Sequence, residues 1–188
     1  MPLIKPTVSL SASLADESSL VSSAQRAPAE FAALYDRYFR QIYHYLYSRV
    51  GSAAEAEDLT AQTFLAALET LPRYHHREHF AAWLFTIARN KARDFYRTGM
   101  PPILLDENHP DKADDPLSQV IQADQVEQLA NLVQKLDADE QELIRLRYVA
   151  DLSFTEIGVC LGRKEDTVKK TFYRLLARLQ RQLELSHD

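Results

Sequence analysis

Residues 83–97 read WLFTIARNKARDFYR, and this stretch decides the first half of the fold. At helical period its apolar residues share one face, made of Trp83, Leu84, Ile87, Ala88 and Phe95. Arginines at positions 89, 93 and 97 recur every fourth residue on another face, with about 6 Å between successive side chains. The pattern predicts an amphipathic helix with a basic stripe, which suits either solvent or nucleic acid.

The composition favours a helical protein without catalytic chemistry. Only four of the 188 residues are glycine, which excludes a glycine-rich phosphate-binding loop, and no run alternates like a half-buried strand. The single cysteine, Cys160, excludes an internal disulfide, and its place on an apolar helix face predicts a buried thiol. No carboxylate cluster or nucleophile–base pair stands out. We therefore expect an all-α protein that is not an enzyme and needs no cofactor.

Charge is unevenly distributed, although the net charge is −5. Six Lys or Arg residues and two acidic residues lie between Arg73 and Arg97, and seven and two lie between Arg163 and Arg181. Residues 100–126 reverse the balance, with six acidic residues and one lysine. Two basic segments around an acidic one indicate nucleic-acid binding at two places.

Helix signals divide the chain into two small helical domains joined by an acidic, flexible linker. Residues 1–27 are rich in Ser and Ala and lack a period, which predicts a mobile tail. Residues 28–99 carry three helices, enough for one small core. Residues 100–126 form the linker and the start of a helix, and residues 127–188 form the second domain.

Apolar periodicity predicts the buried faces of the first two helices. The residues on these faces are Phe31, Leu34, Tyr35, Tyr38, Ile42 and Tyr45 in the first helix, and Leu59, Phe64, Leu65 and Leu68 in the second. Glu55, Glu57 and Asp58 open the second helix. They either complement its dipole or form a partner-docking surface, and composition leaves both readings open.

The second domain has the pattern of a helix-turn-helix. Ser153 and Glu156 have the spacing of a capping box and open a short helix, Phe154–Leu161. A turn at Gly162 follows, and then a long basic helix over residues 165–185. Its inward positions are Val168, Phe172, Leu175, Leu179 and Leu183. Caps, turn and apolar spacing all favour the motif.

The second helix of such a motif enters the major groove near its start. Lys169, Lys170 and Arg174 are therefore the groove-facing candidates, and Arg163 and Thr167 suit phosphate. Lysine and arginine bind guanine edges and phosphates alike, so base readout and positioning stay undivided here.

The loop before residue 80 adds aromatic and imidazole groups, with the sequence Arg73, Tyr74, His75, His76 and, further on, His79. Together with Tyr96 on the basic helix, these side chains suit unstacked bases of single-stranded nucleic acid. The alternative for Tyr74 is packing over the helix junction. The histidines do not follow the zinc-protease order, and we expect no metal site.

Most of the chain resembles the sigma-70 family of bacterial sigma factors, specifically the small extracytoplasmic-function (ECF) class. The matching motifs are EDL at 57–59 with QTF at 62–64, FAAWLFTIARNKARDFYR at 80–97, LIRLRY at 143–148, LSFTEIG at 152–158 and DTVKK at 166–170. Three departures stand out: Gly158 replaces a usual Ala, Asp166 replaces the usual Gly before Thr-Val, and RLL at 174–176 replaces the usual Arg-Ala-Arg.

The resemblance implies a promoter-specificity subunit of RNA polymerase. Docking on the β′ clamp falls to Glu57, Asp58, Leu59 and Gln62. Contact with the minus-ten element, and its melting, falls to Arg73, Tyr74, His75, His76, Trp83, Arg89, Asn90, Arg93 and Arg97. Reading of the minus-thirty-five element falls to Arg163, Thr167, Lys169, Lys170 and Arg174. Implied partners are core polymerase (β′ clamp and β flap), promoter DNA and an anti-sigma factor.

No apolar run reaches membrane-spanning length and no signal-peptide pattern opens the sequence, so we expect a cytoplasmic protein without membrane insertion. The alternative function is a stand-alone helix-turn-helix regulator. Such a protein would bind DNA tightly without polymerase, as a dimer on a two-fold site.

Overall fold

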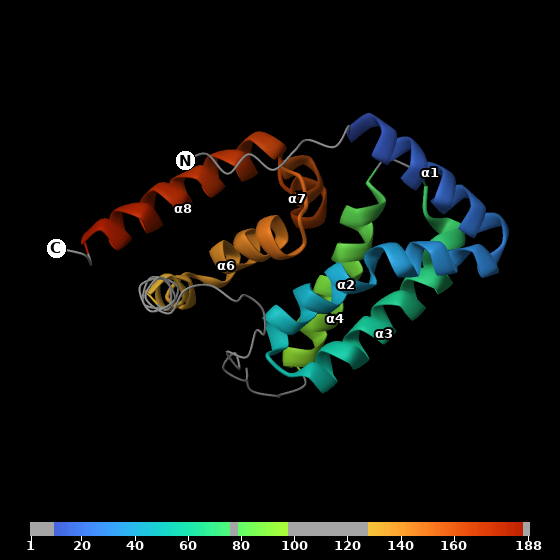
Figure 1. Ribbon diagram of the computed structural model, residues 1–188, viewed down its shortest axis with the longest axis horizontal. Coiled ribbons are helices and arrows are strands. Elements are labelled where there is room, and N and C mark those ends of the chain that lie inside the picture. Colours follow the sequence, from blue (N-terminus) through green and yellow to red (C-terminus); the bar gives the residue numbers. More distant parts are fainter. Residues whose placement is uncertain (1–9, 76–78, 98–127, 186–188) are drawn as a thin grey trace, which may run out of the picture. The chain divides into compact units, whose positions relative to one another are not determined.

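The computed structural model describes residues 10–75, 79–97 and 128–185, and every regular element within these ranges is helical (Figure 1). The all-α prediction is confirmed for these residues. Backbone contacts divide the chain into two compact units, Met1–Ile103 and Leu104–Asp188. Among the described helices, none combines the length and the apolar character needed to cross a bilayer.

The first unit packs four helices around one core (Figure 1). They are α1 (Leu10–Arg26), α2 (Phe31–Val50), α3 (Ala53–Thr70) and α4 (Phe80–Arg97), with short 3-10 turns η1 (Pro28–Glu30) and η2 (Leu71–Arg73). Helices α2, α3 and α4 contact one another, and α1 contacts α2, α4 and η2. The core is partly aromatic: the rings of Tyr45 and Phe85 meet edge to face at 5.3 Å.

Local signals fix the helix ends in this unit. Gly51 ends α2 in the left-handed conformation, with φ of 70°, which glycine adopts without steric cost. The next residue, Ser52, caps α3 by accepting a hydrogen bond from the amide of Glu55 at 3.4 Å. Pro72 lies in the η2 turn that follows α3.

The prediction of a mobile tail differs from the structure, because Leu10–Arg26 form helix α1. Val21 and Ala24 lie on its inner face with 0% and 3% of their surface exposed. The serine-rich composition leaves few apolar residues to mark that face. Packing against α2 supplies the stability that the local sequence lacks.

Three residues predicted in the core lie at the surface instead. Tyr35, Leu65 and Leu68 are 39%, 58% and 36% exposed. Tyr35 still packs its ring on Phe64, at a centroid distance of 4.7 Å. The helices α2 and α3 bury a narrower stripe than the periodicity suggested, which leaves apolar surface on the outside of α3.

The second unit is also helical. Residues 128–134 are helical, and α6 (Ala138–Ile144), the π-helical turn η3 (Arg145–Val149), α7 (Phe154–Leu161) and α8 (Glu165–Leu185) follow. Its buried side chains are Leu143, Leu146, Leu152, Ile157, Cys160, Val168, Phe172, Leu175 and Leu179. Burial of Cys160 is as predicted. The acidic linker over residues 100–126 lies outside the described residues.

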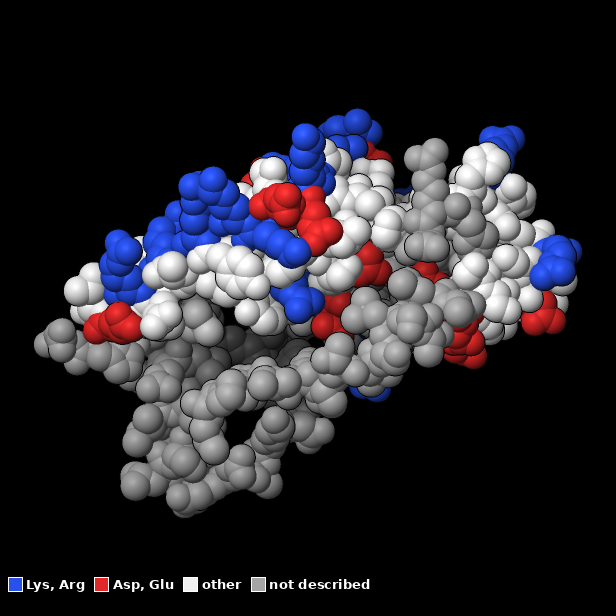
Figure 2. Space-filling model, turned by 90° about the horizontal axis from the view of Figure 1, so that it is seen from above, with Lys and Arg blue, Asp and Glu red and all other residues white. Residues whose placement is uncertain are grey.

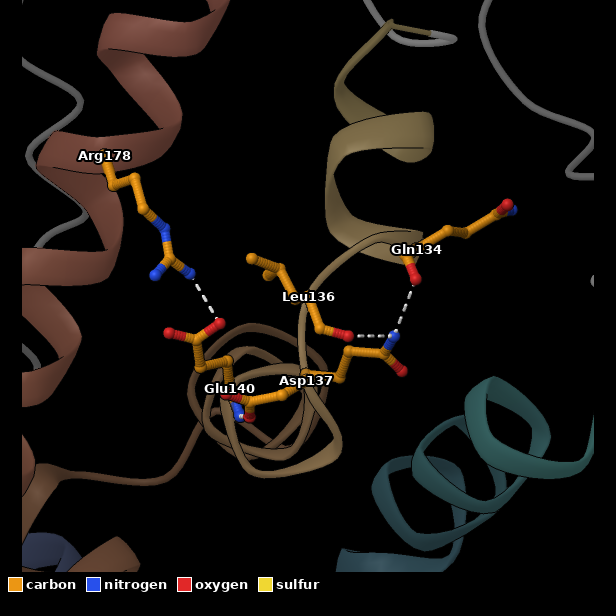
Figure 3. Close-up of polar contacts among 6 residues, drawn as sticks. Gln134, Leu136, Asp137, Glu140 and Arg178 are labelled. Carbon is orange, nitrogen blue, oxygen red and sulfur yellow. Dashed lines mark hydrogen bonds and ion pairs between the residues drawn. The ribbon is translucent and has the colours of Figure 1, made fainter.

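Side chains at the start of α6 hydrogen-bond the backbone that leads into the helix and connect α6 to α8 (Figure 3). Asp137 accepts a hydrogen bond from the amide of Glu140 at 2.9 Å, and Gln141 donates to the carbonyls of Gln134 and Leu136, both at 3.1 Å. The carboxylate of Glu140 pairs with Arg178 of α8. These contacts fix the direction of α6 beneath α8.

Candidate nucleic-acid interface

Helix α4 is amphipathic as predicted, but of the five residues on the predicted apolar face only Leu84 and Ala88 are buried, and Trp83, Ile87 and Phe95 are half-buried. Phe80, Leu84, Phe85, Ala88 and Ala92 are buried. Arg93 and Arg97 are exposed, whereas Arg89 and Asn90 are half-buried. Arg97 lies 3.5 Å from Asp94, and its side chain remains 81% exposed. The outer face of α4 therefore carries solvent-accessible guanidinium groups supported by a well-packed inner face.

An aromatic cluster closes the start of α4. The ring of Tyr74 lies 4.7 Å from Trp83 and 5.7 Å from Phe80. Tyr74 and Trp83 are half-buried, while Arg73 and His75 are exposed, and His76 lies outside the described residues. Of the two readings for Tyr74, packing over the helix junction is the one the structure shows.

Tyr96 also has a structural contact, because its hydroxyl donates to the carbonyl of Arg49 at the end of α2. This bond joins the C-terminal turns of α2 and α4. Tyr96 as a whole is half-buried.

The residues at the acidic start of α3 are partly exposed and partly buried. Glu57, Asp58 and Gln62 are exposed, and the amide of Gln62 donates to the Asp58 carboxylate at 2.7 Å. Leu59 is 3% exposed and packs in the core, so its assignment to a docking surface is wrong. The exposed Leu65, three residues after Gln62, belongs to the same surface and was missed, since it had been assigned to the core.

The helix-turn-helix is confirmed in its local geometry. Ser153 and Glu156 form a reciprocal capping box at the start of α7. Gly162 ends α7 with φ of 66°. Gly158 lies so close to the turn that a Cβ there would be 2.7 Å from the carbonyl oxygen of Arg163, which accounts for a glycine at this position.

The first turn of α8 contains an ion pair. The carboxylate of Glu165 pairs with Lys169 at 2.5 Å and accepts a hydrogen bond from the Thr155 hydroxyl of α7 at 2.7 Å. The bond from Lys169 lowers the pKa of Glu165, and Thr155 adds to the effect. The same bond raises the pKa of Lys169. Lys169 is therefore a charged side chain that is already ion-paired within α8.

The other Lys and Arg side chains of α8 and of the turn before it differ in whether they form ion pairs. Figure 2 shows Lys and Arg side chains gathered along this helix. Arg163 pairs with Asp139, and Arg178 pairs with Glu140. Lys170 and Arg174 are exposed, and neither makes an ion pair with any described residue. Thr167 is exposed one turn before them.

Two exposed aromatic side chains of this unit were not anticipated. Tyr148 and Tyr173 are 64% and 60% exposed, and their rings pack at 5.8 and 6.0 Å on Phe172. Tyr173 lies between Lys170 and Arg174 in sequence. Its place off the apolar stripe of α8 was the signal that could have found it.

The described residues contain no group of three or more His, Cys, Asp or Glu side chains that could hold a metal ion. Both His75 and His79 are described, and neither belongs to such a group.

Comparison with known proteins gives matches in both units. The model of Sigma-70 region 2 matches residues 34–100, and the model of Sigma-70, region 4 matches residues 126–179. Both matched regions contain the surfaces described above, α3 with α4 in one and α7 with α8 in the other.

Individual relatives carry the same description. The chain is 35% identical over 172 residues to the ECF RNA polymerase sigma factor BldN of Streptomyces coelicolor, covering 87% of this chain but only 64% of BldN. It is 30% identical over 165 residues to the ECF RNA polymerase sigma factor SigW of Bacillus subtilis, covering 81% of this chain and 88% of SigW. The solved structure of CnrH in complex with the cytosolic domain of CnrY shares the fold, with a TM-score of 0.63, 24% identity and coverage of 88% and 96%.

Proposed function

The chain belongs to the ECF class of the sigma-70 family of RNA polymerase sigma factors, and on that basis we propose which of its surfaces meet polymerase and DNA. A sigma factor is not an enzyme: it binds DNA and directs transcription initiation by the polymerase that carries it.

We propose that the basic face of α8 reads the minus-thirty-five element, with Lys170 and Arg174 as the main contacts. The observation that carries this assignment is their exposure without ion pairs, directly after the helix-turn-helix turn. Lys169 contributes less, because it is ion-paired with Glu165. Arg163 and Thr167 flank the start of the helix, where phosphates run beside the groove.

The outer face of α4 contacts the minus-ten element in this proposal. Arg93 and Arg97 supply exposed positive charge, and Arg89 and Asn90 lie half-buried beside them. Trp83 and Tyr74, whose rings pack at 4.7 Å with a tilt of 37°, form an aromatic edge against which an unstacked base could rest. Arg73 and His75 are exposed next to that edge.

The exposed side of α3 binds the β′ clamp of core polymerase in this proposal. It combines Glu57, Asp58 and Gln62 with the exposed apolar Leu65. An apolar anchor with a polar rim is the usual composition of a protein–protein interface. Binding to the β flap and to an anti-sigma factor remain predictions from the family resemblance.

Polymerase binding is tested by size-exclusion chromatography of the chain with core bacterial RNA polymerase. Asp58→Ala and Leu65→Ala should each weaken co-elution. Asp16→Ala is the control, because it removes an exposed carboxylate of the same unit from α1, outside the proposed surface. Wild-type co-elution with both α3 variants would show that the docking surface lies elsewhere.

DNA recognition is tested by selecting holoenzyme-bound members of a randomised duplex library. Lys170→Ala should weaken or relax the minus-thirty-five part of the enriched motif by about 1–3 kcal/mol, if Lys170 contacts a base edge. Arg181→Ala is the control: it removes the same charge from an exposed position about 16 Å further along α8. Equal motifs from wild type and Lys170→Ala would refute the assignment.

A further inference from the structure

Helix α1 lies outside the residues that match the region 2 model, yet one of its faces is built into the first unit. Glu17, Val21, Ala24 and Gln25 are spaced four, seven and eight residues apart, and therefore share a face. Glu17, Val21 and Ala24 are at most 8% exposed, and Gln25 is half-buried. Both polar members of this face bind the same connection between α3 and α4.

Gln25 holds the beginning of that connection. Its side-chain amide nitrogen donates to the carbonyl of Leu71 at 3.0 Å and to the carbonyl of Tyr74 at 2.6 Å. Leu71 is the first residue after α3, and Tyr74 is the residue whose ring packs on Trp83. One side chain of α1 thus fixes both the η2 turn and the backbone of the aromatic cluster.

Glu17 holds the other end. One oxygen of its carboxylate accepts a hydrogen bond from the backbone amide of Phe80, the first residue of α4, at 3.1 Å. The other oxygen accepts from the Tyr38 hydroxyl of α2 at 2.6 Å. A buried carboxylate at this position satisfies a backbone donor and complements the dipole of α4. The start of the basic helix is therefore anchored to α1.

The two anchors are connected by a rigid spacer. Glu17 and Gln25 are eight residues apart on one helix, which separates their Cα atoms by about 12 Å. Because α1 is packed against α2 through Val21, this distance sets how far apart the two ends of the connection can lie. Figure 1 shows α1 beside the end of the unit where α3 ends and α4 begins.

We propose that α1 is a positioning element for minus-ten recognition: through Glu17 and Gln25 it holds the backbone of Tyr74 and the start of α4 at Phe80 in place. This inference rests on the proposed function of α4. Neither residue contacts DNA. Their loss should loosen the aromatic edge and weaken minus-ten selectivity while leaving minus-thirty-five selectivity unchanged.

The first part of the test measures the connection itself, in the full chain without polymerase. Glu17→Ala should make the Phe80 amide exchange about tenfold faster, the factor that corresponds to losing a hydrogen bond to a charged group. Gln25→Ala should increase acrylamide quenching of Trp83, the only tryptophan of the chain. Amides of α8 should exchange at wild-type rates in both variants, which separates local loosening from a general effect on folding.

Two substitutions serve as controls on the same helix. Asp16→Ala removes an exposed ion pair between α1 and Arg37 of α2, and Arg26→Ala removes an exposed side chain next to Gln25. Neither removed side chain binds the connection. Should Glu17→Ala fail to fold, Gln25→Ala still tests the inference. Glu17→Gln is a milder variant, because its amide has one acceptor oxygen, whereas the Tyr38 hydroxyl and the Phe80 amide each donate to a separate oxygen of Glu17.

The second part selects from a randomised duplex library with holoenzymes carrying each variant. The inference predicts that Glu17→Ala and Gln25→Ala flatten the minus-ten half of the motif and that both controls match wild type. Wild-type exchange at Phe80 and wild-type quenching of Trp83 in the two variants would overturn the anchoring. Local loosening with an unchanged minus-ten motif would overturn the link to recognition. If wild-type holoenzyme enriched no two-part motif, the proposed function itself would fail and this inference with it.

Discussion

Gly158 shows how one missing side chain shapes the helix-turn-helix. Its carbonyl accepts a hydrogen bond from the amide of Arg163 at 2.8 Å, and a Cβ at this residue would lie 2.7 Å from the Arg163 carbonyl oxygen. The obstacle is a backbone atom, which cannot rotate away. The turn between α7 and α8 is therefore tighter than a residue with a side chain would permit.

We expect Gly158→Ala to destabilise the second unit by about 1–2 kcal/mol. Overpacking against backbone costs about 1–3 kcal/mol, and the better helix propensity of alanine returns at most about 1 kcal/mol. Hydrogen exchange of the slowest α8 amides measures the change. Val159→Ala, at a 49% exposed neighbouring position, should stay within about 0.5 kcal/mol of wild type. Equal exchange in Gly158→Ala and wild type would show that the turn relaxes without cost.

Protonation of Glu165 provides a second prediction for single residues. Its pKa is lowered by Lys169, so the ion pair persists above the unfolded-state pKa of a glutamate and is lost as the pH falls through the lowered value. The pKa of Lys169 is raised, so its side of the pair is lost only as the pH rises through that raised value. At neutral pH the pair is intact, and Lys169 is less available to DNA than Lys170.

Lys169→Ala should raise the pKa of Glu165 toward its ordinary value, because the largest cause of the lowering is removed. A carbon-detected NMR titration of the Glu165 carboxyl group measures this. Lys170→Ala is the control, since Lys170 makes no ion pair with Glu165 or any other described residue. If Glu165 titrated identically in wild type and Lys169→Ala, the contact would not persist in solution.

Helix α7 depends strongly on its cap because it has only eight residues. Ser153 accepts from the amide of Glu156 at 3.2 Å, and the Glu156 carboxylate accepts from the Ser153 amide at 2.7 Å. Isolated helices of this length are not stable in water, so the cap and the packing of Ile157 carry the helix.

Ser153→Ala should therefore destabilise the second unit by about 1 kcal/mol, the usual cost of losing an N-cap acceptor. In this variant the Glu156 amide should exchange its hydrogen faster than in wild type, and the amides of α6 should change less. Ser153→Thr keeps the acceptor oxygen and should restore most of the stability. A loss of equal size in the Thr and Ala variants would assign the effect to packing and not to capping.

The sequence predicted best those elements whose ends carry their own signals. The helices Phe154–Leu161 and 165–185 were predicted with the boundaries that the structure has, since caps, Gly162 and apolar spacing coincide there. Helix α1 was missed, because its stabilising contacts lie in α2 and in the connection after α3, more than ten residues away. Local periodicity carries no trace of such contacts.

The same distinction applies to the candidate sites. Exposure of Arg93, Arg97, Lys170 and Arg174 follows from helical period alone. Burial of Leu59 follows from its apolar spacing, whereas exposure of Leu65 depends on how α2, α3 and α4 meet, which the sequence of one helix does not determine. The packing of the Tyr74 ring on Trp83 likewise depends on the meeting of η2 and α4.

For the whole molecule, the arrangement of charge matters more than its sum. The net charge of −5 opposes binding to DNA, whereas α4 and α8 each present exposed cations on one face. A chain of this kind gains little from non-specific attraction. We therefore expect recognition to depend on polymerase, which holds both surfaces against the same DNA and so raises the effective concentration of the second contact once the first has formed.

This expectation distinguishes a sigma factor from a self-sufficient regulator with the same helix-turn-helix. Fluorescence anisotropy with duplexes from the enriched library should show weak binding by the free chain and much tighter binding by holoenzyme. In holoenzyme, Arg174→Ala should reduce the slope of log K against log salt by about 0.9, if Arg174 contacts one phosphate. Arg181→Ala tests whether the distal end of α8 stays off the DNA, and it should leave the slope unchanged. Tight binding by the free chain, with no gain from polymerase, would instead indicate that the two units suffice to bind the promoter by themselves.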